Sequence, residues 1–555
     1  MSSRRKGTVV RLAVFMAALL SVCMFLALQP NKITVFRFSK MGTTVTDTCF
    51  ISRTADIAIA APPNATVYYT TDGSTPDENA QQYTQPIVLQ PASGDFPNCL
   101  LLKAIAFYAD GTKSQVLTHT LWAHTRIQEQ FQSLLLSISA DPTQLTDGPN
   151  GILYGENVWL RGAESEREIY LEAVSSSGRE ILNQKAGARV YGMLSRRGSI
   201  QSLKLYARKT IDGYTGKFDF DVFGSLGYDG QIIDRYDRLV VRNSSNSEYD
   251  FWCGFIRDVL NQQLAEQAGY TDYQRAIPAV AYINGEYYGF FWLHENYCDD
   301  FLKQKYGKGK GHFEVIEGSE LEKTVDESDP LNAAAAREFN RLYQRLAYSD
   351  LTDEKNFAEL NAFIDVESYL KNFAFNIYIN NVDWPHNNYK CYRYYPSASE
   401  PYGTGALDGK WRFLYHDLDY TMGNYGRPES SAQYNILRDI MSADHTRYCP
   451  LFTNLMKRED CKTFFLSEIV RLRDGALSAQ NVIDLKTMLV EEREHEMQRF
   501  FVHLSSLETT TGSVSDANNA YAKSLQRIDD FILNRAQYLQ IHLIETFALP
   551  EDYFG

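Results

Sequence analysis

Two short clusters of acidic and amide side chains have the residue types and spacing that phosphoryl transfer needs. Asp383 and Asn388 lie five positions apart on a polar, Pro-containing segment, and Asp417 and Asp419 follow an apolar run at 411–415. In protein kinases an Asp accepts the proton of the attacking hydroxyl, an Asn of the same loop binds a metal ion, and a further Asp holds metal against the phosphates. Such oxygen ligands suit Mg²⁺ or Mn²⁺. A purely structural interpretation stays open, because Asx residues are also common in turns.

The elements that must position these clusters are predicted from the hydrophobic pattern. Helices are expected over 331–348 and 355–379, a strand over Tyr389–Tyr395, and long helices over 462–505 and 517–547. Upstream, the pattern predicts strands over 133–236, a helix over Phe251–Ala268, and a hairpin over Val280–Leu293. The Asn284-Gly285 pair of that hairpin favours a type I′ turn. This order predicts an α+β fold with a β-rich lobe followed by a mainly helical lobe, as in a bilobal kinase.

Charge and length narrow the classes of function. The chain has 555 residues, enough for two or three domains, and a net charge of −14. Nucleic-acid partners are not expected, because phosphate backbones are bound by clustered Lys and Arg.

The N-terminal residues 1–30 resemble a targeting segment. Arg4, Arg5 and Lys6 precede an apolar run at 12–28, which fits a signal anchor or a cleaved signal peptide. We expect a single N-terminal anchor, membrane contact through this segment only, and the remaining domains at the cell surface. In an oxidising compartment, disulfides between Cys49 and Cys99 and between Cys449 and Cys461 are plausible.

Residues 31–123 read as a small all-β domain. Short alternating runs are separated by Asp-Gly turns at 72–73 and 110–111, which predicts a β-sandwich. The stretch Val67–Pro76, with Tyr83 and Pro86, resembles the Ig-like module at the C-terminus of chitobiases and β-hexosaminidases. This module is expected to act as a spacer or to bind a cell-wall glycan, and both alternatives stay open.

Residues 130–548 resemble the CotH kinase family of atypical protein kinases. The resemblance rests on Leu239–Asn246, on Phe255–Leu260 and on Tyr282–Glu295, and it extends to the loop from Asp383 to Asn388 and to Asp417-Leu-Asp419. It implies ATP- and metal-dependent phosphorylation of Ser or Thr on secreted or surface proteins. By the same resemblance, Asp383 is the catalytic Asp, Asn388 and Asp417 bind metal, and Asp419 is a weaker second acidic ligand.

One departure from the family pattern affects the expected ATP site. Gln201 stands where the family commonly has a Lys, and a neutral amide cannot supply the charge that would neutralise phosphates. Arg196 and Lys204 are the candidate replacements. Strand alternation places Lys204 on the face opposite to Gln201 and Leu203, which favours Arg196. Glu295 is expected to pair with the basic phosphate-binding residue, or to be a hydrogen-bonding residue at the end of the hairpin.

Two other functions remain as alternatives. Gln201 favours a surface adhesion or scaffold protein that keeps the kinase fold without transfer activity. A metal-dependent hydrolase using His416, Asp417 and Asp419 is less favoured, because such short patterns are common by chance.

Overall fold

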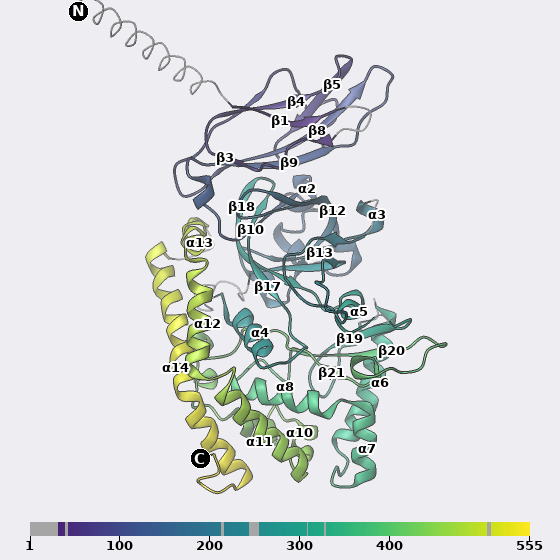
Figure 1. Ribbon diagram of the computed structural model, residues 1–555, viewed down its shortest axis with the longest axis vertical. Helices are drawn as coiled ribbons and strands as arrows, with labels where there is room; N and C mark the ends of the chain where they lie inside the picture. The colour runs from purple at the N-terminus through teal and green to yellow at the C-terminus, as the bar shows by residue number, and fades with distance from the viewer. Residues whose placement is uncertain are drawn as a thin grey trace, which may run out of the picture.

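The computed structural model describes residues 31–38, 43–212, 216–243, 255–307, 309–326, 329–507 and 512–554. The predicted targeting segment at 1–30 lies outside these residues. Within the described ranges, none of the helices combines the length and the apolar character needed to cross a membrane. The chain forms a β-sandwich at one end, a β-barrel in the middle and a mainly helical lobe at the other end (Figure 1).

The N-terminal domain is built from two sheets that share one apolar core. The first sheet has the order β2(Thr43–Thr44), β1(Asn31–Arg37), β4(Ala55–Ala60) and β7(Ile87–Leu89). The second has the order β3(Phe50–Ile51), β9(Leu117–Ala123), β8(Asn98–Tyr108), β5(Ala65–Thr70) and β6(Gln81–Gln82). Buried side chains from both sheets, including Val35, Ile57, Leu102 and Leu121, fill the space between them. The predicted β-sandwich is present.

The β-rich lobe of the second domain is a closed barrel. Its strand order is β10(Leu134–Ser139), β11(Arg167–Val174), β12(Glu180–Tyr191), β13(Ser202–Tyr206), β16(Arg238–Arg242), β18(Glu286–Glu295) and β17(Ala276–Ile283). The barrel closes because β10 pairs with β17 in parallel, with Leu134 opposite Ala279. Two short strands, β14(Phe218–Asp219) and β15(Arg235–Tyr236), pair beside it.

The hairpin that the sequence predicts joins β17 to β18. Asn284 and Gly285 have φ angles of +49° and +86°, so both residues adopt the left-handed conformation that a type I′ turn requires. Helix α4(Arg257–Gln267) replaces the longer helix expected over Phe251–Ala268. Residues 251–254 of that prediction lie outside the described part of the chain.

The helical lobe surrounds a three-stranded sheet of β19(His312–Gly318), β20(Tyr389–Tyr395) and β21(Arg412–Phe413). Its first helices are α5(Asp299–Tyr306), α6(Pro330–Ala347), α7(Glu354–Phe363) and α8(Val366–Tyr378). Later in the chain come α9(Ile436–Met441), α10(Pro450–Leu455), α11(Glu459–Asp474), α12(Ala479–Glu491), α13(Glu494–Ser506) and α14(Val514–Phe547). The fold class predicted from the sequence, α+β with a β-rich and a helical lobe, is confirmed.

Two of the predicted long helices are divided, one of them by a side-chain cap. The expected helix over 355–379 divides because the side chain of Asp365 accepts a hydrogen bond from Ser368 N and starts α8 there. The expected helix over 462–505 divides into α11, α12 and α13, with breaks at Gly475–Ser478 and at Arg493.

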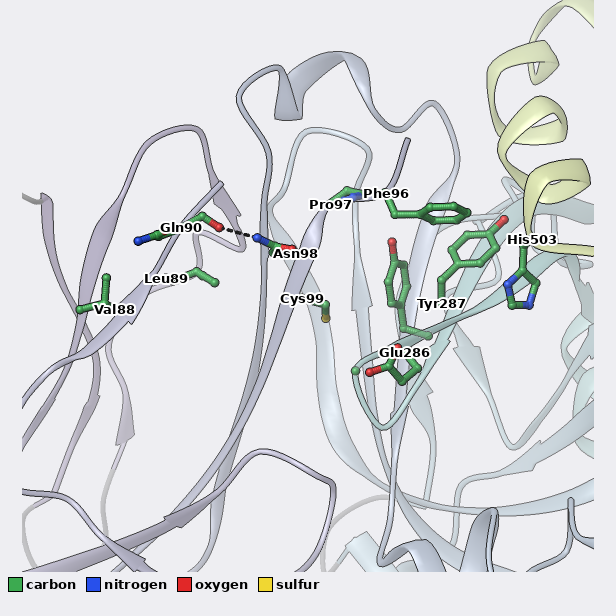
Figure 2. Close-up of a pocket in the computed structure, with 12 residues that line it drawn as sticks. Val88, Leu89, Gln90, Phe96, Pro97, Asn98, Cys99, Glu286, Tyr287 and His503 are labelled. Carbon is green, nitrogen blue, oxygen red and sulfur yellow. Dashed lines mark hydrogen bonds between the residues drawn. The ribbon is translucent and has the colours of Figure 1, made fainter. Parts of the chain in front are cut away.

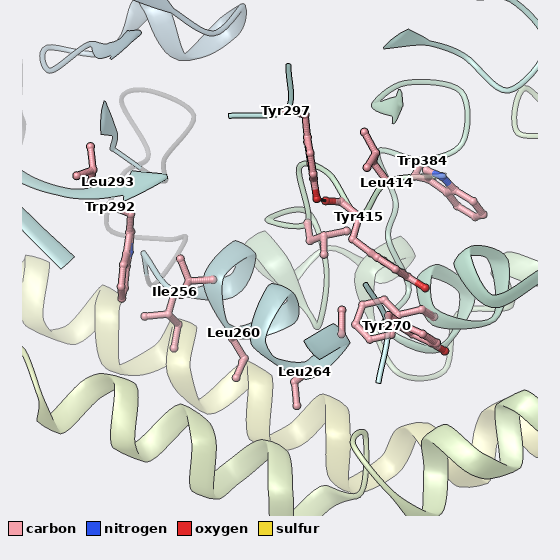
Figure 3. Close-up of a cluster of buried hydrophobic side chains, with 14 of the residues drawn as sticks. Ile256, Leu260, Leu264, Tyr270, Trp292, Leu293, Tyr297, Trp384, Leu414 and Tyr415 are labelled. Atoms are coloured by element: carbon pink, nitrogen blue, oxygen red, sulfur yellow. Dashed lines mark hydrogen bonds between the residues drawn. The ribbon is translucent and has the colours of Figure 1, made fainter. Parts of the chain in front are cut away.

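The lobes share a continuous core around α4. Leu260 and Leu264 project from α4 toward the C-terminal helices, and Trp292 of β18 lies beside the start of α4 (Figure 3). Trp292 donates from Nε1 to the carbonyl of Phe255 at 2.7 Å. The guanidinium of Arg257, which is 1% exposed, donates to the main-chain oxygens of Thr421 and Ser524. Helix α4 is therefore fixed to both the acidic segment 417–419 and the long C-terminal helix α14.

Candidate active site

The loop that carries Asp383 and Asn388 is held rigidly between α8 and β20. The side chain of Asn381 donates to Asn376 of α8 at 2.9 Å, and the 2%-exposed Trp384 packs on Phe373 with ring centroids 4.5 Å apart. Asn388 then donates from Nδ2 to Oδ2 of Asp383 at 2.8 Å. The two residues that the sequence pairs by spacing are therefore in direct contact.

Two of the proposed metal ligands have unusual backbone conformations. Asn388 and Asp417 have φ angles of +54° and +56°, in the left-handed region that non-glycine residues rarely occupy. Asn and Asp tolerate this region better than other residues, and such conformations cluster at functional sites. Asn388 lies directly before β20, and Asp417 lies four residues after the end of β21.

The acidic pair at 417–419 is bridged by an arginine from the barrel. Nη2 of Arg242, at the end of β16, donates to Oδ1 of Asp417 and lies 3.0 Å from Oδ2 of Asp419. Arg242 also lies 3.8 Å from Asp258 of α4, whose Oδ1 accepts from Leu418 N at 2.8 Å. One guanidinium and one helix carboxylate thus connect the barrel, α4 and the acidic pair.

Burial and mutual repulsion raise the pKa values of two carboxylates in this cluster. Burial raises the pKa of Asp383, and the neighbouring charge of Asp417 raises it further. Burial also raises the pKa of Asp419 well above its usual value, with Asp417 adding to the shift and Arg242 opposing it. Burial alone would lower the pKa of Arg242, but Asp417, Asp258 and Asp419 outweigh it and raise that pKa. The carboxylates are thus close enough to repel one another and to favour cation binding.

Lys204 lies on the face of the barrel that is turned toward this cluster. Strand alternation holds, because Leu203 and Leu205 are buried in the apolar core while Lys204 points the other way. The expectation that this orientation takes Lys204 away from the site is wrong, since the outward face of the neighbouring strand β16 also carries Arg242. Burial, together with the charges of Arg238 and Lys390, lowers the pKa of Lys204 to about 8.

Arg196 and Glu295 are not brought to the cluster. The guanidinium of Arg196 is 6% exposed and donates to the main-chain oxygens of Val158, Leu160, Val190 and Gly192. Its charge therefore stabilises the loops at the barrel rim. Glu295 is fully buried and accepts from Arg275 N at 2.9 Å. The Glu295 carboxylate contacts neither Arg196 nor Lys204, because β18 turns it toward the opposite face from His294.

Gln201 is engaged in packing at the start of β13. Its side chain is 8% exposed, donates to Gly198 O and lies 3.0 Å from the hydroxyl of Tyr288. The missing family Lys is thus replaced by a residue with a local structural contact.

Four residues near the cluster were not singled out from the sequence. Arg242 and Asp258 belong to the segments Leu239–Asn246 and Phe255–Leu260, which resemble the family. The position of Arg242, a basic residue at the end of an apolar strand, could have indicated a role for it in the site. Lys390 of β20 pairs with Glu317 of β19 at 2.7 Å and lies 3.1 Å from His416 Nε2. Nothing in the local sequence indicates that second pairing.

The predicted disulfides are not formed. Cys49, Cys99, Cys449 and Cys461 are all free thiols, as are the other cysteines of the described residues. The sulfur of Cys49 lies 3.9 Å from Nε2 of His119, and that of Cys449 donates to the carbonyl of Arg447 at 3.3 Å. Each sulfur has a different local partner, so neither pair is in bonding contact.

A cavity of about 730 Å³ lies away from the acidic cluster, at the junction of the β-sandwich and the barrel. Phe96 and Asn98 line it from the sandwich, while Glu286, Tyr287 and His503 line it from the second domain (Figure 2). The rings of Phe96 and Tyr287 are in edge-to-face contact with centroids 5.0 Å apart. Its size and domain-interface position are typical of small-ligand sites.

The donor set of the acidic cluster fits a divalent cation and a phosphorylated ligand. Asp383, Asn388, Asp417 and Asp419 offer carboxylate and amide oxygens, the ligands that Mg²⁺ and Mn²⁺ prefer. The charge of Asp417 acts on Lys390 of β20, and the charge of Lys390 acts on Lys204 of β13, so both ammonium groups lie near the cluster. Carboxylates together with ammonium groups suit a metal–phosphate complex.

Comparisons with known proteins show the family of the chain. Residues 188–539, more than half of the chain, match the family model described as CotH kinase protein, and residues 57–121 of the sandwich match the model described as Fn3 associated. A search of the curated proteins found no match. The first match includes the loop at 383–388, the acidic pair and Arg242. The chain therefore belongs to the CotH kinase protein family.

Proposed function

We propose that this protein is an ATP- and metal-dependent protein kinase that phosphorylates Ser or Thr of secreted or cell-surface proteins. The main support for the proposal is the 2.8 Å hydrogen bond between Asn388 and Asp383. The carboxylate of Asp383 is also close enough to Asp417 for the charge of Asp417 to raise its pKa. In protein kinases an Asp and an Asn of one catalytic loop accept the substrate proton and hold Mg²⁺, and a further Asp also holds Mg²⁺.

In this proposal Asp383 accepts the proton of the acceptor hydroxyl. Hydrogen bonds from Asn387 and Asn388, at 3.1 and 2.8 Å, fix both oxygens of its carboxylate. A fixed carboxylate with a pKa raised by burial is suited to general-base work near neutral pH. Asn388, Asp417 and Asp419 would hold Mg²⁺ or Mn²⁺, which neutralises phosphate charge when bound.

Both lobes supply positive charge to the site, Lys204 from β13 of the barrel and Lys390 from β20 of the helical lobe. Lys204 and Lys390 would contact the ATP phosphates and so supply the positive charge that a Lys at position 201 provides in the family. In protein kinases a Lys–Glu pair couples a strand to a helix. In this proposal the pair between Arg242 of β16 and Asp258 of α4, at 3.8 Å, would couple the barrel to a helix in that way, in place of a pair with Glu295.

A surface location is part of the same proposal. It is supported by the basic residues and the apolar run in 1–30, which suit an anchor or signal peptide. The substrates would then be proteins of the same compartment.

A second candidate function is a kinase-fold scaffold that binds a cell-wall glycan. Gln201, engaged in packing with Tyr288, and the junction cavity with its aromatic rings, amides and Glu286 favour it. Aromatic rings that flank polar side chains suit the apolar faces and hydroxyls of a saccharide.

Transfer of label from γ-labelled ATP separates the two. The full chain is incubated with Mg²⁺ or Mn²⁺ and with peptide arrays, beside Asp383→Asn and the exposed-site control Asp444→Asn. Label on Ser or Thr that is lost only in Asp383→Asn supports the kinase. Equal incorporation by all three proteins, or none by any of them, contradicts it.

A further inference from the structure

Three ionisable side chains meet where the β-sandwich contacts the barrel, far in sequence from the candidate active site. His119 comes from β9 of the sandwich, Glu172 from β11 and Glu180 from β12 of the barrel. Nδ1 of His119 lies 3.1 Å from Oε2 of Glu180 and 3.6 Å from Oε1 of Glu172. One ligand atom from each residue lies within 4.8 Å of the others. Among the described residues, this is the one His, Cys, Asp and Glu group that meets that criterion.

The negative charge of the two carboxylates in this group requires a neighbouring positive charge. The side chains of His119 and Glu172 are 0% and 1% exposed, and that of Glu180 is 19% exposed. Two neighbouring carboxylates, one of them fully buried, are costly unless positive charge neutralises them, and the buried Lys103 of β8 interacts with Glu172. A protonated His119 neutralises one of the two charges, whereas a divalent cation bound by neutral imidazole neutralises both.

The distances fit a small transition-metal ion. Zinc binds nitrogen and carboxylate oxygen at about 2.0–2.2 Å in a tetrahedral arrangement, which places neighbouring ligand atoms roughly 3.3–3.6 Å apart. The distance from His119 Nδ1 to Glu172, 3.6 Å, is at the upper end of that range, and the distance to Glu180, 3.1 Å, is slightly shorter, as for a direct hydrogen bond. The imidazole nitrogen favours zinc or a similar transition metal over Mg²⁺ and Ca²⁺, which take oxygen ligands.

The surrounding contacts already orient all three side chains. Thr120 donates from its backbone N to Oε1 of Glu172 at 2.9 Å and from its hydroxyl to Oε2 of the same carboxylate. Asn183 donates to Oε2 of Glu180 at 2.7 Å. The other nitrogen of His119, Nε2, lies 3.9 Å from the sulfur of Cys49. Partners of this kind fix the tautomer and the orientation of metal ligands.

We propose that His119, Glu172 and Glu180 form a divalent-metal site, suited to zinc, that clamps the β-sandwich to the barrel. Each domain supplies ligands, so the ion joins the two domains through direct coordination. The proposal is independent of the kinase function, because none of the three residues belongs to the acidic cluster at 383–419.

Zinc binding by the full chain tests this directly. After chelator treatment and dialysis, zinc uptake is measured by calorimetry and by elemental analysis, for the wild type, His119→Gln and Glu180→Gln. His124→Gln is the matched control, because His124 is equally buried just past β9 and lies 3.0 Å from Gly94 O. Asp417→Asn is a second control, because it alters the candidate active site and leaves His119, Glu172 and Glu180 unchanged.

The expected result is one zinc ion per chain at micromolar concentration. This ion is lost in His119→Gln and Glu180→Gln and kept in His124→Gln and Asp417→Asn, and zinc raises the Tm of the wild type but not of His119→Gln. Absence of zinc binding by the wild type, or unchanged zinc binding by both Gln variants, overturns the proposal. The three residues would then form a contact in which a proton on His119 neutralises the carboxylates.

Discussion

Replacing Arg242 with Met should destabilise the protein strongly and in a pH-dependent way. The side chain of Arg242 is 15% exposed and faces Asp417, Asp419 and Asp258, of which the last two are 9% and 2% exposed. Removing one partner of a buried ion pair costs about 3–5 kcal/mol, because the remaining charge is left without compensation. We expect a loss of this size in the free energy of unfolding at pH 8.

The pH dependence follows from Asp419. Its pKa is already raised by burial and by Asp417, and the loss of Arg242, which opposes that shift, raises it further. Folded Arg242→Met then binds a proton that the unfolded chain does not, so its stability falls as pH rises. Between pH 8 and pH 6 the variant should regain up to about 2.7 kcal/mol relative to the wild type, at about 1.4 kcal/mol per pH unit for one proton.

Urea unfolding at pH 6 and pH 8 measures both effects. The control is Lys185→Met, which removes an exposed pair with Glu168 at 2.7 Å and should cost less than about 1 kcal/mol at either pH. A loss for Arg242→Met no larger than that of the control, or a loss that is the same at both pH values, would refute the assigned role of Arg242.

Three further predictions concern other parts of the molecule. Because the pKa of Lys204 is about 8, the KM for ATP should rise as pH increases from 7 to 9.5, and Lys204→Arg should abolish that rise; an unchanged pH profile in the variant would exclude Lys204 from the ATP site. Reductant should leave the Tm unchanged, since Cys49 and Cys99 are free thiols; a Tm that drops with reductant would contradict this. Arg535→Met should cost about 3 kcal/mol or more in chemical unfolding, because the fully buried guanidinium donates to carbonyls of α8 and of the segment before α9; a loss below about 1 kcal/mol would show that water replaces those bonds.

The sequence predicts those features that depend on local pattern. The hairpin at Asn284-Gly285, the strand Tyr389–Tyr395 and the helical character of the second lobe follow from turn chemistry and periodicity, although two of the predicted helices are divided in the structure. Barrel closure was not predicted, because it depends on parallel pairing between β10 and β17, which are distant in the chain.

The site was predicted where its residues are close in sequence and missed where they are distant. Asp383 and Asn388 share one loop, whereas Arg242 reaches Asp417 across 175 positions of the chain. The direction of Lys204 could not be deduced from alternation alone, because alternation does not say which face of the barrel meets the helical lobe. Arg196 looked suitable by charge, yet its carbonyl partners are visible only in three dimensions.

The most direct test of the kinase proposal separates ATP binding from transfer in one variant. Asp383→Asn removes the proposed base and retains a side chain of the same shape, so it should bind Mg²⁺–ATP with an unchanged affinity and transfer phosphate at least about a hundredfold more slowly. Calorimetry and single-turnover label transfer with the full chain measure the two quantities. The kinase proposal predicts loss of phosphate transfer with ATP binding intact. Transfer at the wild-type rate by Asp383→Asn would contradict it.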